Sequence, residues 1–189
     1  VAQADPLPAP SLTPPLNGNG SPASFAAGPL GKLFVGGALT GMGMYQSNST
    51  PGDHTWQADS TNAQGWVEKN DGPIQGFAEF GGYSFPSLGY PYTTAAKTTG
   101  DTFGVLPVGY IKLVANSSFN IEAGKLPTLI GSEYGFTFQN MNIERGLLWF
   151  QEPIVSRGVQ ANFTKGPVAL SVSLNDGYYT SRYNTFSGL

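Results

Sequence analysis

One hairpin near the end of the chain decides the fold. It reads Val159-Gln160-Ala161-Asn162-Phe163-Thr164, then Lys165-Gly166-Pro167, then Val168-Ala169-Leu170-Ser171-Val172-Ser173-Leu174-Asn175. Apolar and polar residues alternate in both halves, and this period of two predicts two strands with one apolar and one polar face. The polar face holds neutral side chains, whereas the wet face of a soluble sheet usually carries Lys and Glu. The pattern therefore favours the wall of a water-filled channel and leaves open a soluble sandwich with a Ser/Asn face.

The composition excludes several classes of protein. Charged residues make up 11% of the 189 residues, against about 25% in ordinary soluble domains, which argues against a coiled coil. Lys and Arg number 9, Asp and Glu number 12, and the net charge is -3, so a nucleic-acid partner is not expected. With no cysteine and only His54, no metal site or thiol nucleophile is expected. No apolar run reaches about 18 residues, which leaves a β-sandwich or a membrane β-barrel.

Seven strands are predicted after a proline-rich segment. Residues 1–29 hold seven prolines, which remove backbone donors, so we interpret 1–29 as a linker. Tight turns are predicted at Asn70-Asp71-Gly72, Asn116-Ser117-Ser118 and Lys165-Gly166-Pro167, because Asn, Asp, Gly and Ser suit turn conformations. The predicted strands are 30–46, 56–69, 73–84, 105–115, 119–127, 156–164 and 168–176.

Short and long connections alternate along this series. Short turns follow the second, fourth and sixth strands, and long loops follow the others. Outer-membrane barrels show this asymmetry, with short turns on the periplasmic side and long loops outside. The sequence therefore predicts an all-β, antiparallel up-and-down transmembrane β-barrel, with the linker 1–29 in the periplasm and 30–189 forming the N-terminal part of the barrel.

The same parity predicts which side chains line the channel. A turn at 116–118 sets Lys112 opposite Glu122, and opposite charges across a ladder contribute about 0.2–1 kcal/mol. The expected pore-lining residues are Glu79, Lys112, Glu122, Gln160, Asn162, Ser171 and Ser173. Lys125 breaks the pattern, because its parity places it on the apolar face unless a bulge at Gly124 re-aims it.

Two loop features carry further expectations. Aromatic residues gather where strands meet long loops: Tyr83, Phe85, Tyr90, Tyr92, Trp149, Phe150, Tyr178, Tyr179 and Tyr183. Such rings are typical of the girdles at membrane interfaces; the alternative is a contact surface for glycans or proteins. The long loop 128–155 carries Glu144, Arg145 and Glu152, which we expect to line a constriction, since charged rings select ions by sign; the alternative is an outer loop with solvated charges.

Several segments together resemble a known family. They are Leu33-Phe34-Val35-Gly36-Gly37, Glu68 to Gln75, Tyr83 to Gly89, Glu122 to Glu133, Gly158-Val159-Gln160-Ala161 and Asn175-Asp176-Gly177-Tyr178. In these segments the chain resembles the OmpL-like outer-membrane β-barrel porins. The resemblance implies a diffusion channel and supplies no catalytic residues. Members of the family are longer, and bacterial barrels have an even number of strands, so we expect the chain to be part of a larger barrel.

The sequence therefore predicts a porin of the outer membrane for passive diffusion of small hydrophilic solutes or ions. No Gly-x-Ser-x-Gly motif and no phosphate-binding loop occurs, so no enzyme activity and no cofactor are expected. The expected partners are outer-membrane lipid and the solutes, and assembly into a homo-oligomer is left open. The alternative is a secreted β-sandwich that binds glycans or proteins through its Tyr-rich loops.

Overall fold

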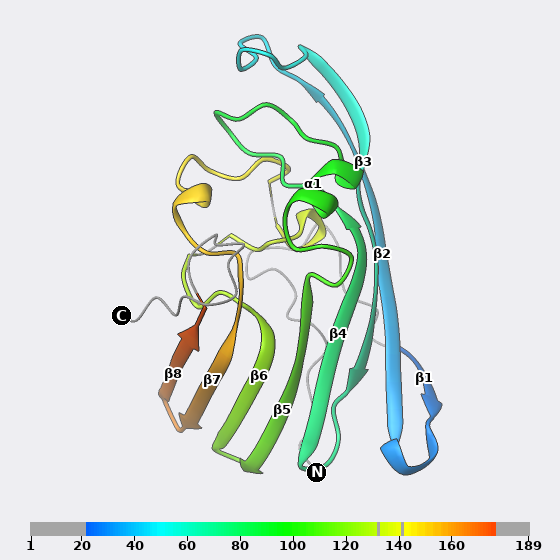
Figure 1. Ribbon diagram of the computed structural model, residues 1–189, viewed down its shortest axis with the longest axis vertical. Helices are drawn as coiled ribbons and strands as arrows, with labels where there is room; N and C mark the ends of the chain where they lie inside the picture. The colour runs from blue at the N-terminus through cyan, green and yellow to red at the C-terminus, as the bar shows by residue number, and fades with distance from the viewer. Residues whose placement is uncertain (1–21, 132, 141, 177–189) are drawn as a thin grey trace.

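The computed structural model describes residues 22–131, 133–140 and 142–176, and these form one eight-stranded antiparallel sheet (Figure 1). Each strand pairs with the next one in the sequence. The strands are β1 (Ala23–Ala26), β2 (Lys32–Tyr45), β3 (Trp56–Lys69), β4 (Ile74–Tyr83), β5 (Val108–Asn116), β6 (Phe119–Pro127), β7 (Val155–Lys165) and β8 (Val168–Asn175). The predicted all-β, up-and-down architecture is confirmed, and among the described residues β1 and β8 do not pair, so the sheet is open.

Helical structure is confined to the connections. Helix α1 (Ala95–Asp101) lies between β4 and β5, and three single-turn 3₁₀ segments are η1 (Gly28–Leu30), η2 (Thr137–Gln139) and η3 (Trp149–Gln151). Among the described residues, no helix has the length and the apolar character needed to cross a membrane.

All seven predicted strands are confirmed as β2 to β8, with ends that differ by up to three residues. The structure adds the short strand β1 inside the segment interpreted as a linker, where it pairs Ala23 with Val35 and Ala26 with Lys32. Four residues between Pro22 and Pro29 are too few to show an alternating pattern. A strand of this length forms because β2 offers a free edge beside it.

Connections are sorted by length onto the two ends of the sheet, as predicted (Figure 1). At one end, two to four residues join β3 to β4, β5 to β6 and β7 to β8. The β5–β6 turn is tighter than the predicted three-residue loop: Asn116 pairs with Phe119, and a bulge lies between Val114 and Asn116. The Oδ1 atom of Asn116 accepts hydrogen bonds from the backbone N–H groups of Ser118 and Phe119. The bulge restores the expected register, in which Lys112 faces Glu122.

The register lines up two continuous rows of side chains on opposite faces. One row runs Ile74, Leu113, Ile121, Ala161 and Val172 across β4 to β8. The row beside it on the other face runs Gln75, Lys112, Glu122, Gln160 and Ser173. Ile74 is 58% exposed and Val172 is 69% exposed, whereas Gln75 and Gln160 are each 8% exposed. We call these the apolar face and the polar face.

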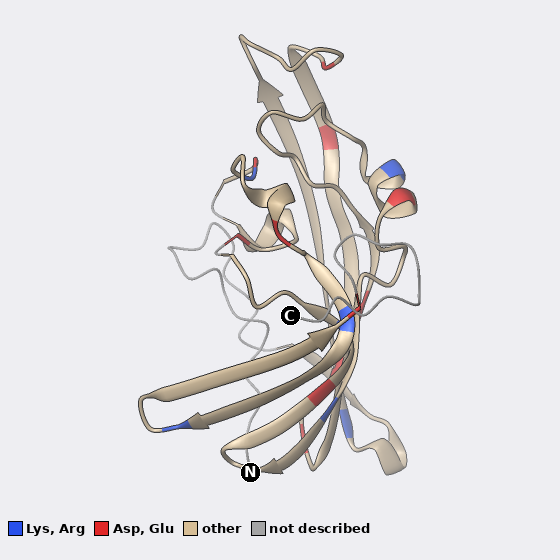
Figure 2. Ribbon diagram, turned by 60° about the vertical axis from the view of Figure 1, so that its left-hand side comes forward, with Lys and Arg blue, Asp and Glu red and all other residues tan. Residues whose placement is uncertain are grey.

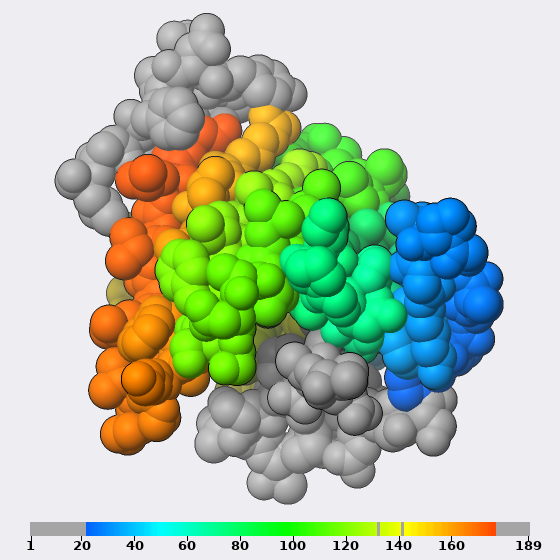
Figure 3. All heavy atoms as spheres, turned by 90° about the horizontal axis from the view of Figure 1, so that it is seen from below, coloured from blue at the N-terminus to red at the C-terminus, as the bar shows by residue number. Residues whose placement is uncertain are grey.

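The sheet is curved, and Figure 3 shows the lower ends of the strands following an arc. The loop between β6 and β7 reaches Trp66 on β3 across the polar side of the sheet. A loop that bridges strands as far apart as these crosses the hollow side of the arc. The polar face is therefore the concave face of the sheet. The apolar side chains point outward.

Two glycines permit close approach of neighbouring strands. Gly81 on β4 has φ +129°, and a Cβ there would lie 2.1 Å from the carbonyl oxygen of Ala63. Gly124 on β6 has φ +145°, and a Cβ there would lie 2.3 Å from the carbonyl oxygen of Gly109. Any side chain at either position would meet backbone atoms, which cannot move without breaking the ladder.

We expect Gly81→Ala to lower the free energy of unfolding by about 2 kcal/mol or more, because it adds backbone strain and a clash with the backbone. Gly43→Ala is the matched control, because an added Cβ there meets nothing within 4 Å and its φ is not positive. The midpoint of denaturant-induced unfolding measures both. Equal midpoints for the two variants would contradict the assignment of a strained close approach to Gly81.

Candidate functional site

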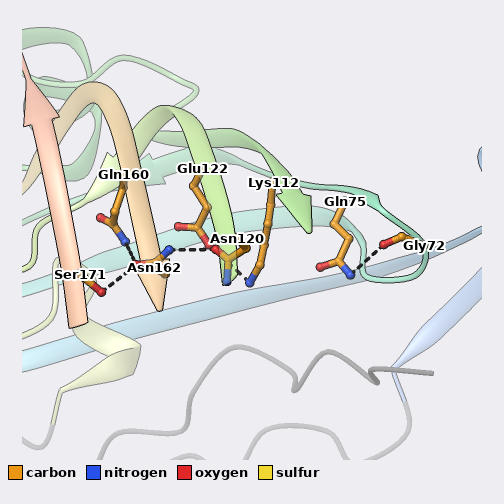
Figure 4. A network of polar contacts seen from close by, with 8 residues as sticks. All are labelled: Gly72, Gln75, Lys112, Asn120, Glu122, Gln160, Asn162 and Ser171. Atoms are coloured by element: carbon orange, nitrogen blue, oxygen red, sulfur yellow. Dashed lines mark hydrogen bonds and ion pairs between the residues drawn. The ribbon is translucent and has the colours of Figure 1, made fainter. Parts of the chain in front are cut away.

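A network of polar side chains covers the lower half of the polar face (Figure 4). The Nζ atom of Lys112 lies 3.4 Å from the Oε1 atom of Glu122 on the neighbouring strand. This confirms the predicted cross-strand pair. At the β4 end of the row, the Nε2 atom of Gln75 donates to the carbonyl oxygen of Gly72 at 3.2 Å.

Asn162 is the centre of the neutral part of this network. Its Nδ2 atom donates to the Oδ1 atom of Asn120 at 2.9 Å. Its own Oδ1 atom accepts hydrogen bonds from Gln160 at 2.8 Å and from the hydroxyl of Ser171 at 2.7 Å. Side chains from β6, β7 and β8 are therefore tied together without net charge. Ser173, two residues further along β8, donates to the Oδ1 atom of Asn175 at 2.7 Å.

The structure places every predicted pore-lining residue on the same face of the sheet. Glu79 differs from the others, because it is only 2% exposed. It lies higher on β4, where its Oε1 atom accepts a hydrogen bond from Gln64 at 3.2 Å. Gln64 accepts from Asn62 at 2.6 Å, and Asn62 accepts from Thr40 at 2.9 Å. Glu79 is thus the end of a second buried network and does not contact open solvent.

Glu79 is buried because the loop between β6 and β7 folds over the upper half of the polar face. Phe136 of this loop packs in a buried cluster with Phe77, Tyr83 and Val108. Phe138 stacks on Trp66 of β3, with ring centroids 6.1 Å apart and planes 13° apart. The upper part of the concave side is therefore filled by aromatic rings.

Arg145 holds this loop together from inside. Its side chain is fully buried, and its Nη1 atom donates to Thr137 Oγ1 at 3.1 Å and to the carbonyl of Ile143 at 3.0 Å. The Nη2 atom donates to the carbonyl of Gly135 at 3.0 Å. The guanidinium also lies over the ring of Trp149, at 5.6 Å from the centroid.

The backbone of Arg145 ties this loop to the one between β4 and β5. Its N–H donates to the carbonyl of Pro86, and its own carbonyl accepts from Leu88. Burial lowers the pKa of Arg145 to about 10, and the nearby carboxylate of Glu133 acts in the opposite direction. The group therefore remains charged at neutral pH.

The expectation that Arg145 lines a constriction is corrected by this burial, because no part of its side chain reaches solvent. Glu144, the neighbouring residue, accepts a hydrogen bond from Gln46 at 2.7 Å, and burial raises the pKa of its carboxyl group. Burial, with a contribution from Glu133, also raises the pKa of Glu152. The two carboxylates lie in the loop region above the polar face, and whether they face a channel stays a prediction.

The predicted aromatic girdle is only partly where we expected it. Tyr83 and Trp149 are buried, and Phe85 packs against both of them with centroids 5.2 Å and 6.1 Å away. These three rings form the inner cluster rather than an outward belt. Tyr90 is half exposed beside Phe150, with centroids 4.4 Å apart.

Tyr92 also turns inward, since its hydroxyl donates to Asp59 at 3.0 Å and lies 3.2 Å from the hydroxyl oxygen of Ser84. Burial, assisted by Asp59, raises the pKa of Tyr92 to about 12. The remaining predicted girdle residues, Tyr178, Tyr179 and Tyr183, lie outside the described residues.

Lys125 breaks the alternating pattern of β6, and the structure has no bulge at Gly124 that would re-aim it. The pairing of β5 with β6 continues through Gly124 to Lys125, which stays on the apolar side. Its Nζ atom donates to the carbonyl oxygens of Phe103 and Leu106 at 2.8 Å and 2.7 Å. The side chain thus bends to the upper end of the strand, where backbone acceptors are available.

We expect Arg145→Ala to loosen the loop 128–154 without unfolding the strands. Hydrogen bonds to a charged group each contribute about 1.5–3 kcal/mol, so protease cleavage within the loop should accelerate by about tenfold or more. Arg145→Lys should give an intermediate rate, because it keeps the charge and loses the forked geometry. Lys97→Ala on exposed helix α1 is the control. A cleavage rate equal to that of the control would contradict the assigned role.

The comparison with protein families agrees with this geometry. Residues 32–189 match the family described as putative beta-barrel porin-2, OmpL-like. No curated protein and no solved structure gave a significant match to the chain. The matched range begins at the first residue of β2 and includes β2 to β8. The chain therefore belongs to the putative beta-barrel porin-2, OmpL-like family.

Proposed function

We propose that this chain forms part of the wall of an outer-membrane channel through which small hydrophilic solutes diffuse passively. The observation that carries the proposal is the division of one curved sheet into two faces. The outward face presents exposed aliphatic side chains in continuous rows, and the concave face presents hydrogen-bonded polar ones. A water-filled barrel in lipid needs this arrangement.

The length of the apolar band supports the membrane assignment. On β7 the outward residues between Arg157 and Lys165 are Val159, Ala161 and Phe163. The nine residues from Arg157 to Lys165 span about 26 Å along the strand. A tilted transmembrane strand of about 9–11 residues crosses the hydrocarbon core. By this reading the short turns lie in the periplasm and the long loops lie outside.

The alternative, a soluble binding module of the sandwich type, has less support. A sandwich covers its apolar face with a second sheet. The described residues form one sheet, and its aliphatic rows are exposed. The Tyr-rich loops that suggested a contact surface contribute several of their rings to the inner cluster.

The charges that remain on the polar wall favour a weakly selective channel. Glu79 and Arg145 are buried, so the charges left on the described wall include Glu68, Lys112 and Glu122. Lys112 and Glu122 form a pair and nearly cancel. We expect neutral solutes to pass, and among ions we expect a weak preference for cations. The loop 128–154 would narrow the upper part of the channel.

We expect Leu170→Arg to destabilise the protein by about 2–4 kcal/mol in a bilayer, because it places a charge on the lipid-facing side near mid-membrane. Ser171→Arg is the matched control, since the next residue points to the polar face. Unfolding from lipid vesicles measures both. A greater loss for Ser171→Arg than for Leu170→Arg would invert the proposed facing.

Single-channel recording tests the function itself. The protein should conduct in planar bilayers, and Glu122→Gln should shift the reversal potential in a salt gradient toward anions, because Lys112 loses its partner. Glu79→Gln should leave the reversal potential nearly unchanged, because Glu79 is buried. Absence of conductance in the unmodified protein would end the proposal, and a larger shift for Glu79→Gln would place that residue in the lumen.

A further inference from the structure

The hairpin of β2 and β3 is longer than the other hairpins of the sheet, and its upper end extends beyond them (Figure 1). Tyr45 is the last residue of β2 and Trp56 is the first residue of β3, and the two are paired across the ladder. Their rings contact each other, with centroids 4.7 Å apart. Trp56 is 74% exposed and Tyr45 is 57% exposed, so the described residues leave most of this aromatic pair uncovered.

A bulge in β3 turns Trp56 to the outward face. The register between β2 and β3 shifts after Thr40, which leaves Thr61 as an extra residue. Thr61 and Asn62 both point to the concave side, where the hydroxyl of Thr40 contacts their side chains. Below the bulge the even-numbered residues of β3 face the concave side, and above it they face outward, because an inserted residue reverses the parity. The outward position of Trp56 therefore follows from the ladder itself.

The outward face of this hairpin is uncharged from its lower end up to the two rings. Above Lys69, the outward residues of β3 are valine, glycine, alanine and serine as far as Trp56. On β2 they are leucine, valine and glycine as far as Tyr45, and Leu39 among them is 80% exposed. Figure 2 shows how few residues of these strands are charged. The hairpin can therefore contact a membrane along its whole length.

The length of β3 matches the distance from one edge of the hydrocarbon core to the headgroups on the other side. Its 14 residues span about 43 Å along the strand. At the tilt of about 35–45° found in membrane barrels, this is about 30–35 Å along the membrane normal. The hydrocarbon core is about 30 Å thick, and the headgroup regions extend the bilayer to about 40–45 Å. With Lys69 at one edge of the core, Trp56 would reach the headgroups at the other.

We propose that Tyr45 and Trp56 bind the lipid headgroup region of the outer leaflet and hold the long hairpin against the membrane, so that the hairpin does not stand free in water. Each ring combines a large apolar surface with one hydrogen-bonding group, which suits the boundary between hydrocarbon and water. The pair continues the uncharged outward surface, and the polar loop 46–55 begins directly beyond it. The inference rests on the proposed function, in which the outward face contacts lipid.

The test measures quenching of tryptophan fluorescence in the protein reconstituted into lipid vesicles. Trp149 is buried and Trp66 stacks on Phe138 at the concave side, so of the three tryptophans only Trp56 faces outward. Lipids brominated near the headgroup should quench the unmodified protein more strongly than lipids brominated near the end of the acyl chain. The W56F variant should lose this difference. The control W149F removes a buried ring and should keep it; if W149F does not fold, W66F is the control.

Three outcomes would overturn the inference. Equal quenching of W56F and of the unmodified protein by the headgroup-brominated lipid would remove Trp56 from the membrane. Quenching of Trp56 by acrylamide in the water, without quenching by either lipid, would show that the hairpin stands in water. Protection from both kinds of quencher would show that a protein surface, such as a second copy of the chain, covers the pair.

A second experiment tests whether the rings hold the hairpin in place. The chain has no cysteine, so the S60C variant carries a single thiol, on the outward face below the pair. In vesicles this thiol should react slowly with a maleimide that does not enter membranes. The further substitutions Y45S/W56S should accelerate the reaction severalfold, and the exchange Y45W/W56Y should keep it slow. Equal rates with and without Y45S/W56S would contradict the anchoring role.

The two proposals fail separately. Conductance of Y45S/W56S should equal that of the unmodified protein, because neither ring lies on the polar face. A non-conducting unmodified protein in which Trp56 is quenched by headgroup-brominated lipid would end the channel proposal and leave the aromatic anchor standing. A conducting protein in which Trp56 is quenched only from the water would do the reverse.

Discussion

The register between neighbouring strands is the constraint on which the other features depend. Because side chains alternate, a slip of one residue between β5 and β6 would move Lys112 and Glu122 apart and turn apolar residues toward the polar side. The short turns prevent this slip. Asn116 caps its turn with its own side chain, and the adjacent bulge sets the pairing that carries across β7 to β8. The apolar row and the amide network both follow from that one alignment.

The second determinant is the loop between β6 and β7, which converts an open concave surface into a partly filled one. The aromatic rings of this loop cover Trp66, Phe77 and Tyr83. The buried guanidinium of Arg145 fixes the path of the loop from inside. A charged residue inside this loop can therefore shape the concave side without reaching solvent. In this protein Arg145 acts by holding carbonyl groups of its own loop, and the amides and hydroxyls below it provide the polar surface.

Local patterns predicted the strands, the turns, the faces and the Lys112–Glu122 pair, because each depends on parity and on a few adjacent residues. The sequence did not reveal the burial of Glu79, since a segment far away in the chain covers it, or the burial of Arg145, since that depends on how its own loop folds. The aromatic residues show the same limit: composition predicts rings near the strand ends, but the path of the loops decides whether Tyr83 and Trp149 turn inward. Strand β1 was missed because four residues carry too little pattern.

Pairing between sequence neighbours has a consequence for how the sheet assembles. Each strand needs only the preceding one, so chain entropy is lost in small steps and the sheet can grow hairpin by hairpin. The β6–β7 loop breaks this order, because its docking surface on β3 and β4 must exist first. The strands should therefore pair before the loop docks, and the concave side of an assembly intermediate would be more open than that of the folded protein.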